Sequence, residues 1–364
     1  MFRRSDLILA LESSCDETAA SVVERGRIVR SNIIASQHDL HAEYRGVVPE
    51  IASRAHAERI LPIVRRAVAD AGVTLDDLGA IAVGNRPGLI GSLLVGVAAA
   101  KALAWSLGIP VIGVDHVHAH LCAGLIGPPD ALPPAPTFPA LGLVVSGGHT
   151  SLYVCASTTH VRRIGATIDD AVGEAYDKVA AILQLPFPGG PHLDRLARTG
   201  IAKYEGRGGF PISRLSPDSL DFSFSGLKTA ALYAFRGVPE DDRTRQRKIA
   251  RGENPDHPTM SAPDVAATFQ HAAVASVLLK LERALDRHPK CRTLLTGGGV
   301  TANALLRERL TSLAAQRGLD LRLPRMEYCL DNAAMIGALA HDQLAERQGA
   351  GDDLTMTAIP TTAF

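Results

Sequence analysis

The sequence predicts an α/β protein with two similar lobes, and two observations lead to this prediction. Short apolar strands over 80–84 and 110–114 flank a long helical pattern over 89–107. Strands that alternate with helices are typical of α/β folds with largely parallel sheets. In addition, a unit of strand, polar turn and returning strand opens each half, over 8–23 and 141–155. A unit that recurs in two halves of similar size indicates an internal duplication.

Length and composition agree with this architecture. The chain has 364 residues, of which 46% are hydrophobic and 21% charged, a balance that excludes a mostly disordered or fibrous protein. The 38 basic and 38 acidic residues cancel, so overall charge does not drive binding to nucleic acid, although a local basic patch still can. The five cysteines are widely spaced and form no Cys-x-x-Cys pair. This pattern predicts a reducing compartment and no cysteine-built zinc site.

Each hairpin is expected to end in a polar tip. The first tip carries Asp16 and Glu17, and the second carries a Ser-Gly-Gly turn over 145–149. Two related lobes would bring these tips face to face across a cleft, where ligands usually bind. The carboxylate pair would then face the cleft, and a plain surface turn is the alternative.

Two segments stand apart from this pattern. The proline-rich stretch over 127–139 cannot continue a helix or a central strand, so it is expected to be a stiff connection between the halves. The segment over 244–258 is expected to be an exposed insertion. A basic run over 243–248 is a candidate contact for RNA phosphates, with a solvated loop as the alternative.

No targeting or membrane segment is expected. The most hydrophobic stretch, 89–105, contains Gly91, Gly96 and Lys101, which favours a buried helix over a membrane span. The apolar run over 7–11 is too short for a signal peptide. We therefore expect a cytoplasmic protein that does not bind a membrane.

Three histidines directly follow the strand over 110–114. If this segment is helical, His116 and His120 share one face while His118 points away. Two imidazoles at that spacing can clamp a metal ion, and histidines of a metal-free helix are the alternative. A zinc peptidase would need a glutamate after the first histidine, where Val117 stands, so peptidase chemistry is excluded. A carboxylate from elsewhere would complete a two-histidine, one-carboxylate site.

Glycine-rich turns and an acidic stripe are weaker signals. Glycines let backbone amides approach an anion, and the turns over 145–149, 188–191 and 297–299 together favour a nucleotide ligand. None of them has the spacing of a P-loop. Further along, Asp170, Glu174 and Asp177 would form one stripe if the segment is helical throughout. Such a stripe is either a solvated face or a set of carboxylates for ribose hydroxyls or a cation.

Taken together, the motifs resemble those of the TsaD family, which synthesises threonylcarbamoyladenosine in tRNA and was once called O-sialoglycoprotein endopeptidase. The resemblance spans nearly the whole chain. Besides the His116/His120 pair, the motifs are ESSCDETAA (12–20), HAEYRGVVPEIASRAH (41–56), PGLIGSLLVG (87–96), VSGGHT (145–150), DDAVGEAYDK (169–178), FSFSGLKT (222–229), GGVTAN (298–303) and CLDNAAM (329–335).

This resemblance implies a fold and a reaction. The fold is the duplicated two-lobe α/β fold shared by actin, Hsp70 and sugar kinases, known as ASKHA. The reaction transfers a threonylcarbamoyl group from threonylcarbamoyl-adenylate to the exocyclic amine of the adenosine just 3′ of the anticodon, in tRNAs that read codons beginning with A. The alternatives are a small-molecule kinase of the same fold that uses ATP, and a non-catalytic scaffold subunit.

The resemblance also implies the site residues. The family's metal ligands fall on His116, His120 and Asp331, so that Asp331 supplies the missing carboxylate. On chemical grounds, and not from the family's motifs, Asp16 and Glu17 are candidates to orient or deprotonate the incoming amine. The family's substrate contacts fall on Val145, Ser146, Gly147, Gly148, His149, Asp177, Gly190, Asp194 and Asn303.

Domains, cofactor and partners follow from the same resemblance. We expect an N-terminal lobe over 1–126, the connection over 127–139, a second lobe over 140–328, and a C-terminal segment over 329–364 that packs back on the first lobe. One divalent metal ion is expected, Fe²⁺ first and Zn²⁺ as the alternative, with an adenylate as substrate. Expected partners are tRNA and, in a bacterial setting, a smaller paralogous subunit and a P-loop ATPase; a homodimer is expected when the protein is alone.

Three residues depart from the family's pattern. Arg86 and Arg45 stand where glycine is usual, and Leu330 replaces a threonine beside the metal carboxylate. None of them removes a ligand, so they bear on local geometry rather than on the reaction.

Overall fold

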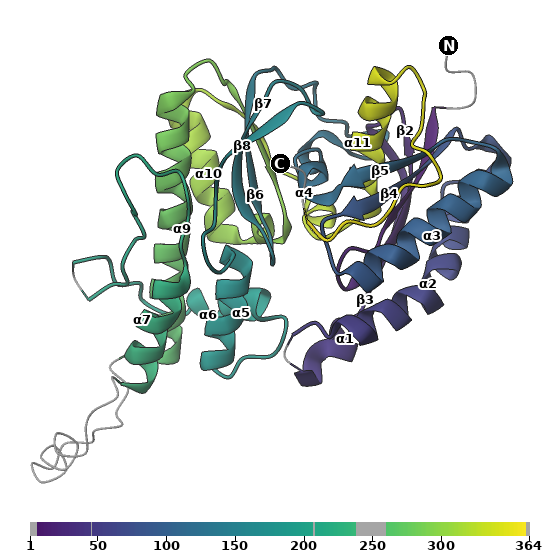
Figure 1. Ribbon diagram of the computed structural model, residues 1–364. Helices are drawn as coiled ribbons and strands as arrows, with labels where there is room; N and C mark the ends of the chain where they lie inside the picture. Colours follow the sequence, from purple (N-terminus) through teal and green to yellow (C-terminus); the bar gives the residue numbers. More distant parts are fainter. Residues whose placement is uncertain (1–5, 45, 207, 238–259, 362–364) are drawn as a thin grey trace, which may run out of the picture.

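The chain forms two five-stranded sheets that lie side by side, each with its own helices (Figure 1). The insertion and basic run expected between 243 and 258 lie outside the described residues, as does Arg45. The computed structural model describes residues 6–44, 46–206, 208–237 and 260–361.

The first sheet has the strand order β3-β2-β1-β4-β5. β1 and β2 form the predicted hairpin and β3 continues it as a third antiparallel strand, whereas β1, β4 and β5 run parallel. The strands are β1 (Leu7–Glu12), β2 (Glu17–Glu24), β3 (Ile28–Ser36), β4 (Ala80–Arg86) and β5 (Val111–Asp115).

The second sheet repeats this arrangement with the order β10-β9-β6-β7-β8. The hairpin β6–β7 is continued by antiparallel β8, and β6, β9 and β10 are parallel. The predicted duplication is therefore confirmed, but the expectation of largely parallel sheets was wrong. Each sheet is mixed, because the strand after each hairpin returns along its edge. The strands are β6 (Ala140–Val145), β7 (Thr150–Cys155), β8 (Val161–Ala166), β9 (Thr293–Gly297) and β10 (Asp320–Arg322).

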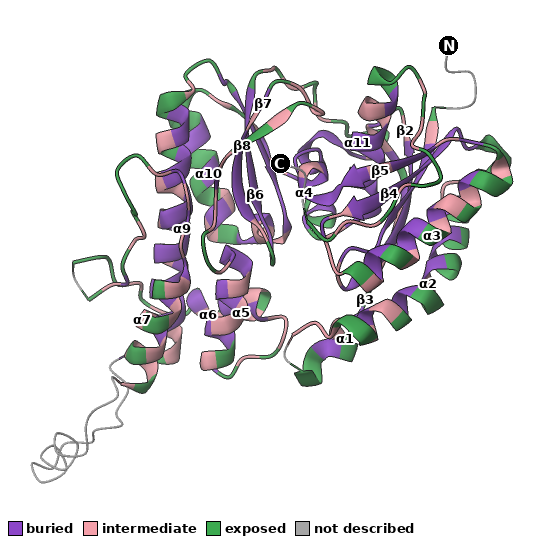
Figure 2. Cartoon of the chain, in the orientation of Figure 1, coloured by how far each residue is buried: buried purple, intermediate pink, exposed green. Residues whose placement is uncertain are grey.

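Helices cover both faces of the first sheet because successive strand residues point to opposite faces. Leu9 and Leu11 of β1 pack with α2 and α3 on one face, while Ile8 and Ala10 pack with α11 on the other. Most strand residues are buried as a result (Figure 2). The helices of this lobe are α1 (His38–His41), α2 (Pro49–Asp70), α3 (Ile90–Leu107), α4 (His116–His120) and α11 (Ala333–Glu346).

In the second lobe, one long helix passes through the core. Phe269, Val277 and Leu281 of α9 are completely or almost completely buried and belong to the same apolar cluster as Leu141 and Leu143 of β6. The helices are α5 (Val172–Ile182), α6 (Gly189–Ala197), α7 (Ser225–Arg236), α9 (Ala262–Arg287) and α10 (Ala304–Arg317). Short 3-10 helices are η1 (Ala42–Tyr44), η2 (Leu75–Asp77), η3 (Ala123–Leu125), η4 (Gly299–Ala302) and η5 (Met326–Tyr328).

The short helix α4 lies between the two sheets. Val117 and Leu121 pack in one apolar cluster with Val144 and Tyr153 of the second sheet, and the ring of His118 contacts Tyr153 edge-on. Residues of α4 that do not face this cluster are thereby held at the junction of the lobes.

The end of the chain returns to the first lobe. Beyond α11, the Asp352 amide donates to the Val111 carbonyl (2.7 Å), and the Asp352 carboxylate accepts from the Gly113 amide (2.8 Å). Lys101 Nζ then donates to the Met356 carbonyl (3.1 Å). These bonds hold the last described residues along β5 and α3.

The apolar helix α3 is less buried than the sequence suggests. One face, with Leu93 and Val97, packs against the sheet, whereas Ile90, Leu94 and Trp105 are exposed. Among the described residues, α3 is the one helix long and apolar enough to cross a membrane. Its contacts with β4 and α2 make it a surface helix of the first lobe.

Candidate metal centre and substrate cleft

Two histidines of α4 form the first part of the site. The helix begins directly at the end of β5, and Asp115 caps it by accepting hydrogen bonds from the amides of Val117 (3.0 Å) and His118 (3.1 Å). As predicted from their spacing, His116 and His120 lie on one face, with ring centroids 4.7 Å apart.

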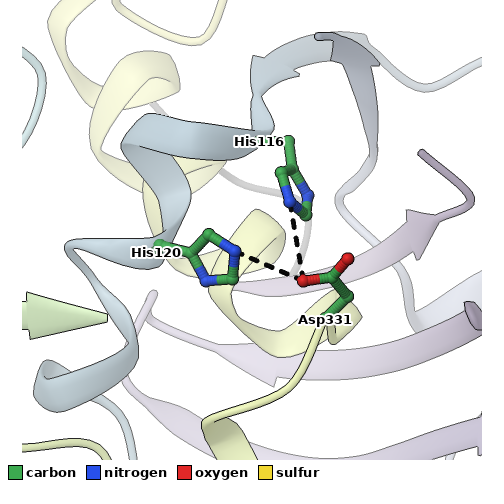
Figure 3. A group of neighbouring side chains, drawn as sticks. All are labelled: His116, His120 and Asp331. Atoms are coloured by element: carbon green, nitrogen blue, oxygen red, sulfur yellow. Dashed lines mark ion pairs between the residues drawn. The ribbon is translucent and has the colours of Figure 1, made fainter. Parts of the chain in front are cut away.

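Asp331 joins them from the other end of the chain. It lies just before α11, whose first turn is capped by the neighbouring Asn332. Asp331 Oδ1 is 3.6 Å from His116 Nε2 and 3.3 Å from His120 Nε2 (Figure 3). One ligand atom from each residue lies within 4.8 Å of the others, a grouping that can hold a metal ion.

Glu12 supports this group, and the sequence analysis did not identify it. Its carboxylate lies at the end of β1, completely buried, with Oε2 2.9 Å from His116 Nδ1. The Ser14 amide donates to the other oxygen (2.5 Å). A carboxylate on the far nitrogen fixes a ligating imidazole's orientation and tautomer. In the sequence, Glu12 could have been recognised as a charged residue at the end of an otherwise apolar strand.

The charges of the group reinforce one another. Burial alone would lower the pKa of His116, but Glu12 and Asp331 outweigh it and raise the pKa to about 10. Burial would raise the pKa of Asp331, yet the two histidines hold it below its usual value. Burial lowers the pKa of His120, which favours the neutral imidazole.

The surroundings of the His120 ring indicate whether the three residues fit a metal ion. Its side chain is completely buried, its Nδ1 has no hydrogen-bond partner among the described residues, and its Nε2 makes only the 3.3 Å ion-pair contact with Asp331. An orphaned buried imidazole is costly unless another ligand satisfies it. Two histidines and a carboxylate are a donor set that Fe²⁺ and Zn²⁺ both accept. These residues therefore fit a divalent metal ion.

The metal group opens on a cavity of about 710 Å³ between the lobes. His116 and Asp331 lie in its wall together with both hairpin tips. Its other lining residues include Val47, Pro87, Gly88, Leu89, Phe187, Gly299, Leu330 and Pro360. Leu330 is 49% exposed there, and Arg86 ends β4 beside this wall.

Asp16 and Glu17 are both buried at the first tip and line the cavity, as the sequence predicts. His38, which the sequence analysis did not identify, places its Nε2 3.1 Å from Glu17 Oε1 and 3.7 Å from Asp16 Oδ2. Burial raises the pKa of Glu17 to about 8, against the opposing hydrogen bond from His38. The same hydrogen bond raises the pKa of His38. The pair can therefore hold a proton near neutral pH.

The second tip is a tight turn. The Ser146 amide donates to the His149 carbonyl (2.8 Å), and the His149 amide donates to Ser146 Oγ (3.1 Å). A Cβ placed on Gly147 or Gly148 would meet no atom of the described chain within 4 Å. These glycines therefore leave room in the cavity that side chains would fill. Burial and the nearby histidines lower the pKa of His149 to about 4.

The remaining predicted substrate residues do not all reach this cavity. Asp177 lines it, and its Oδ1 accepts from the Gly189 amide (2.8 Å) at the start of α6, where Gly190 also lies. Burial raises the pKa of Asp177. By contrast, Val145 lies within β6 with its side chain buried.

Asp194 lines a second cavity of about 310 Å³ bordered by α6, α9 and α10, and Asn303 lies behind this wall in contact with Asp194. Asn303 Nδ2 donates to Asp194 Oδ1 (3.1 Å) and to Gln270 Oε1 (3.0 Å), and its Oδ1 caps α10. Sequence reasoning did not identify Gln270. The structure thus divides the predicted substrate contacts between two cavities.

The predicted acidic stripe was wrong at its first member. Helix α5 begins at Val172, so Asp170 precedes it and pairs with Lys178 (2.5 Å) and Lys228 (3.5 Å). Glu174 also pairs with Lys178 (2.8 Å). Asp170 is thus held by neighbouring lysines, whereas Asp177 and Glu174 line the cavity.

Sequence comparisons agree with the motifs. Residues 28–338 match the family model of TsaD, described as tRNA N6-adenosine threonylcarbamoyltransferase. The chain is 48% identical over 353 residues to the protein of that name from Moorella thermoacetica, covering 97% of this chain and 96% of the relative. It is 46% identical over 349 residues to the one from Halalkalibacterium halodurans, covering 96% and 94%.

A comparison of folds gives a more distant likeness. HypF from T. kodakarensis superposes with a TM-score of 0.58 at 14% sequence identity, covering 95% of this chain and 48% of that chain. At this identity the likeness concerns the fold alone. It extends across both lobes.

Proposed function

The chain belongs to the family of tRNA N6-adenosine threonylcarbamoyltransferases, and we propose that it transfers a threonylcarbamoyl group from threonylcarbamoyl-adenylate to tRNA. The acceptor is the exocyclic amine of the adenosine just 3′ of the anticodon in tRNAs that read codons beginning with A. The observation that carries this proposal is the convergence of His116, His120 and Asp331 at a cleft bordered by both hairpin tips.

These three residues would hold one divalent metal ion, with Fe²⁺ the expected metal and Zn²⁺ the alternative. When bound, such an ion supplies Lewis-acid polarisation of a carbonyl or phosphate oxygen. Glu12 orients His116 toward the cleft through the contact at Nδ1. His149 stays uncharged near neutral pH because its pKa lies at about 4, so it adds no positive charge that would compete with the metal.

The glycine turn offers room for the adenylate. Gly147 and Gly148 leave the cavity wall open beside the metal group. Backbone amides at such a turn can approach an anion and stabilise charge that develops on it. Asp177, at the same wall, is placed to accept a hydrogen bond from a substrate hydroxyl. Gly190, Asp194 and Asn303 border the neighbouring region and are proposed as further adenylate contacts.

Glu17 is proposed to take the proton of the acceptor amine, with Asp16 beside it. The amine nitrogen forms a bond to the carbamoyl carbon, the bond from that carbon to the phosphate oxygen breaks, and AMP leaves with the electron pair. The proton passes to the Glu17 carboxylate, which His38 holds at Oε1 (3.1 Å). With the pKa at about 8, the rate should rise as pH increases through 8. Glu17→Gln should remove this rise, and wild-type turnover in that variant would exclude the role.

Partners and location complete the proposal. The substrate is a tRNA, and the donor is supplied in the cytoplasm. In a bacterial setting, a smaller paralogous subunit and a P-loop ATPase are proposed to work with the chain, and a homodimer is proposed for the chain alone. The relatives' names support acyl transfer over a kinase, and the complete metal group argues against an inactive scaffold.

The proposal is tested by mass spectrometry of tRNA nucleosides. The metal-loaded protein, with partner subunits, is incubated with threonylcarbamoyl-adenylate and an unmodified tRNA that reads such codons. Threonylcarbamoyladenosine should form with the wild type and be lost in His116→Ala. Absence of product from the metal-loaded wild type would reject the proposed reaction and favour the kinase.

A further inference from the structure

A hydrogen-bonded network of buried polar side chains lies behind the first hairpin tip, outside the cavity wall. It includes both ends of the 41–56 motif, which the proposed reaction leaves without a role. Its members are Thr18, Gln37, His41 and His56, and all four are completely buried. None of them is among the described residues that line the large cavity. Buried polar groups of this kind are usually fully hydrogen-bonded, and such a network fixes one arrangement.

In this network, the protonated nitrogen of each histidine can be assigned, because some of its partners can only accept and others can only donate a hydrogen bond. The Val48 amide donates to His41 Nδ1 (3.3 Å), so the proton of His41 is on Nε2, which faces Gln37 Oε1 (3.3 Å). The carbonyl of Cys15 only accepts, so His56 Nε2 carries the proton and donates to it (3.0 Å).

The other nitrogen of His56 then accepts. Thr18 Oγ1 lies 2.8 Å from His56 Nδ1 and donates to it. Burial lowers the pKa of His56, which agrees with a neutral ring carrying one proton. Thr18 therefore favours the tautomer of His56 in which Nε2 carries the proton and donates to the Cys15 carbonyl.

At one end, the network contacts the backbone of the hairpin tip. His56 Nε2 donates to the Cys15 carbonyl, and the backbone N–H of Gln37 donates to the next carbonyl, that of Asp16 (3.1 Å). Two consecutive peptide groups are thus fixed directly before Glu17. Gln37 Nε2 lies 3.4 Å from His56 Nδ1 and joins His56 to His41, so the network reaches Val48 at its other end. The adjacent Val47 lines the cavity.

We propose that His56 is a positioning residue for the transfer reaction, because its hydrogen bond to the Cys15 carbonyl sets where Asp16 and Glu17 present their carboxylates. This inference rests on the proposed function. A displacement of about 1 Å in a catalytic group can lower turnover about 100-fold. A loosened tip would therefore lower kcat and leave binding of the adenylate and of metal intact.

The test compares His56→Leu, which removes the donor, with His56→Gln, whose side-chain amide can still donate to the Cys15 carbonyl. We expect kcat to fall about 10- to 100-fold in His56→Leu, with unchanged KM for the adenylate and unchanged metal content, and to recover largely in His56→Gln. Wild-type kcat in His56→Leu would overturn the inference, as would equal losses in both variants.

Two further variants separate positioning from simple loss of stability. Thr18→Val keeps His56 but removes the nearer partner of its Nδ1 (2.8 Å) and leaves only Gln37 Nε2 (3.4 Å), so kcat should fall several-fold. Combining it with His56→Leu should cause no further loss. Ser21→Ala is the matched control, since Ser21 is a buried hydroxyl of the same strand that donates to the Ser31 carbonyl (2.6 Å). It should lower Tm and leave kcat unchanged. Additive losses in the double variant would reject the network.

A second readout does not depend on the reaction. Cys15 lines the cavity, and burial raises the pKa of its thiol, so it should react slowly with iodoacetamide. His56→Leu should accelerate alkylation of Cys15, measured by peptide mass spectrometry, and His56→Gln should not. If the wild type makes no modified nucleoside but alkylation follows this pattern, the proposed function fails and the positioning of the tip stands. Equal alkylation in wild type and His56→Leu would overturn the inference.

Discussion

Glu12 and His116 show how much of the site depends on a contact that no short motif reveals. The spacing of His116 and His120 predicts their shared face, because four residues are about one helical turn. The resemblance assigns Asp331, and the structure places it beside both histidines. Glu12 could not be assigned in the same way, since its partner is distant in sequence. The two meet only because β1, β4 and β5 run parallel, which brings the end of β1 and the start of α4 to the same edge of the sheet.

Removing the carboxylate charge at Glu12 should therefore weaken metal binding. Glu12→Gln keeps the shape of the side chain but removes the charge and leaves one acceptor oxygen, which cannot serve both the Ser14 amide and His116 Nδ1. A supporting partner of this kind contributes about 10- to 100-fold to metal affinity. Titration with metal should show that loss. Asp342→Asn is the control and should bind metal as the wild type does, because the Asp342 carboxylate pairs with Thr158 and His341. Equal affinity in Glu12→Gln and wild type would contradict the assignment.

Gly148 provides a test of the adenylate site. A methyl group there meets open space in the protein alone but would occupy the region proposed for the substrate. Gly148→Ala should leave Tm unchanged and raise KM for the adenylate about tenfold, or about 1.4 kcal/mol. Gly226→Ala is the matched control, because Gly226 also faces open space but lies in α7 away from the cavity lining. Unchanged KM in Gly148→Ala would place the adenylate elsewhere.

At the scale of elements, hydrogen bonds join the 169–178 motif to the 222–229 motif. Asp169 accepts hydrogen bonds from Ser223 Oγ (2.5 Å), the Phe224 amide (2.8 Å) and Ser225 Oγ (2.8 Å). This contact joins the loop before α5 to the start of α7. The strands and long helices were predictable from periodicity, but this junction was not, because hydrogen bonds between distant loops leave no periodic pattern. For the same reason, the sequence did not show that Asp170 precedes α5 and is not part of it.

The hydrogen bonds accepted by Asp169 make the free energy of unfolding depend on pH. Burial would raise the pKa of Asp169, but the hydrogen bonds outweigh it and lower the pKa from 3.8. Its stabilisation is therefore complete above pH 3.8 and is lost as pH falls through the lower value in the folded protein. Since Asp169 is exposed, Asp169→Asn should cost only about 1 kcal/mol at pH 7. Urea unfolding should show the full difference at pH 7 and a progressively smaller one as pH falls below 3.8. A constant difference across that range would contradict the account.

At the scale of the whole molecule, the site exists only when distant parts of the chain meet. The α4 helix lies between the sheets, and the segment carrying Asp331 returns from the second lobe to the first. The repeated hairpin predicts two lobes because each hairpin is local. The division of the substrate residues between two cavities was not predictable, since it depends on how α6, α9 and α10 pack.

A metal ion held by α4 and Asp331 should stabilise the folded chain. An ion that binds only the folded state adds about 2.7 kcal/mol at a concentration 100 times its Kd. Addition of Fe²⁺ or Zn²⁺ should therefore raise Tm, and a chelator should reverse the rise. Asp331→Asn should abolish the shift, whereas Asp342→Asn, a carboxylate of α11 that pairs with Thr158 and His341, should retain it. An equal shift in Asp331→Asn would exclude the three-residue site.

The most direct test of the central claim measures bound metal and formation of threonylcarbamoyladenosine on the same protein samples. Metal-free protein is loaded with increasing amounts of Fe²⁺ or Zn²⁺, and each sample is assayed with its partner subunits, the adenylate and tRNA. The account predicts that turnover rises in proportion to bound metal and reaches its maximum at one ion per chain. Full turnover in metal-free protein would contradict it.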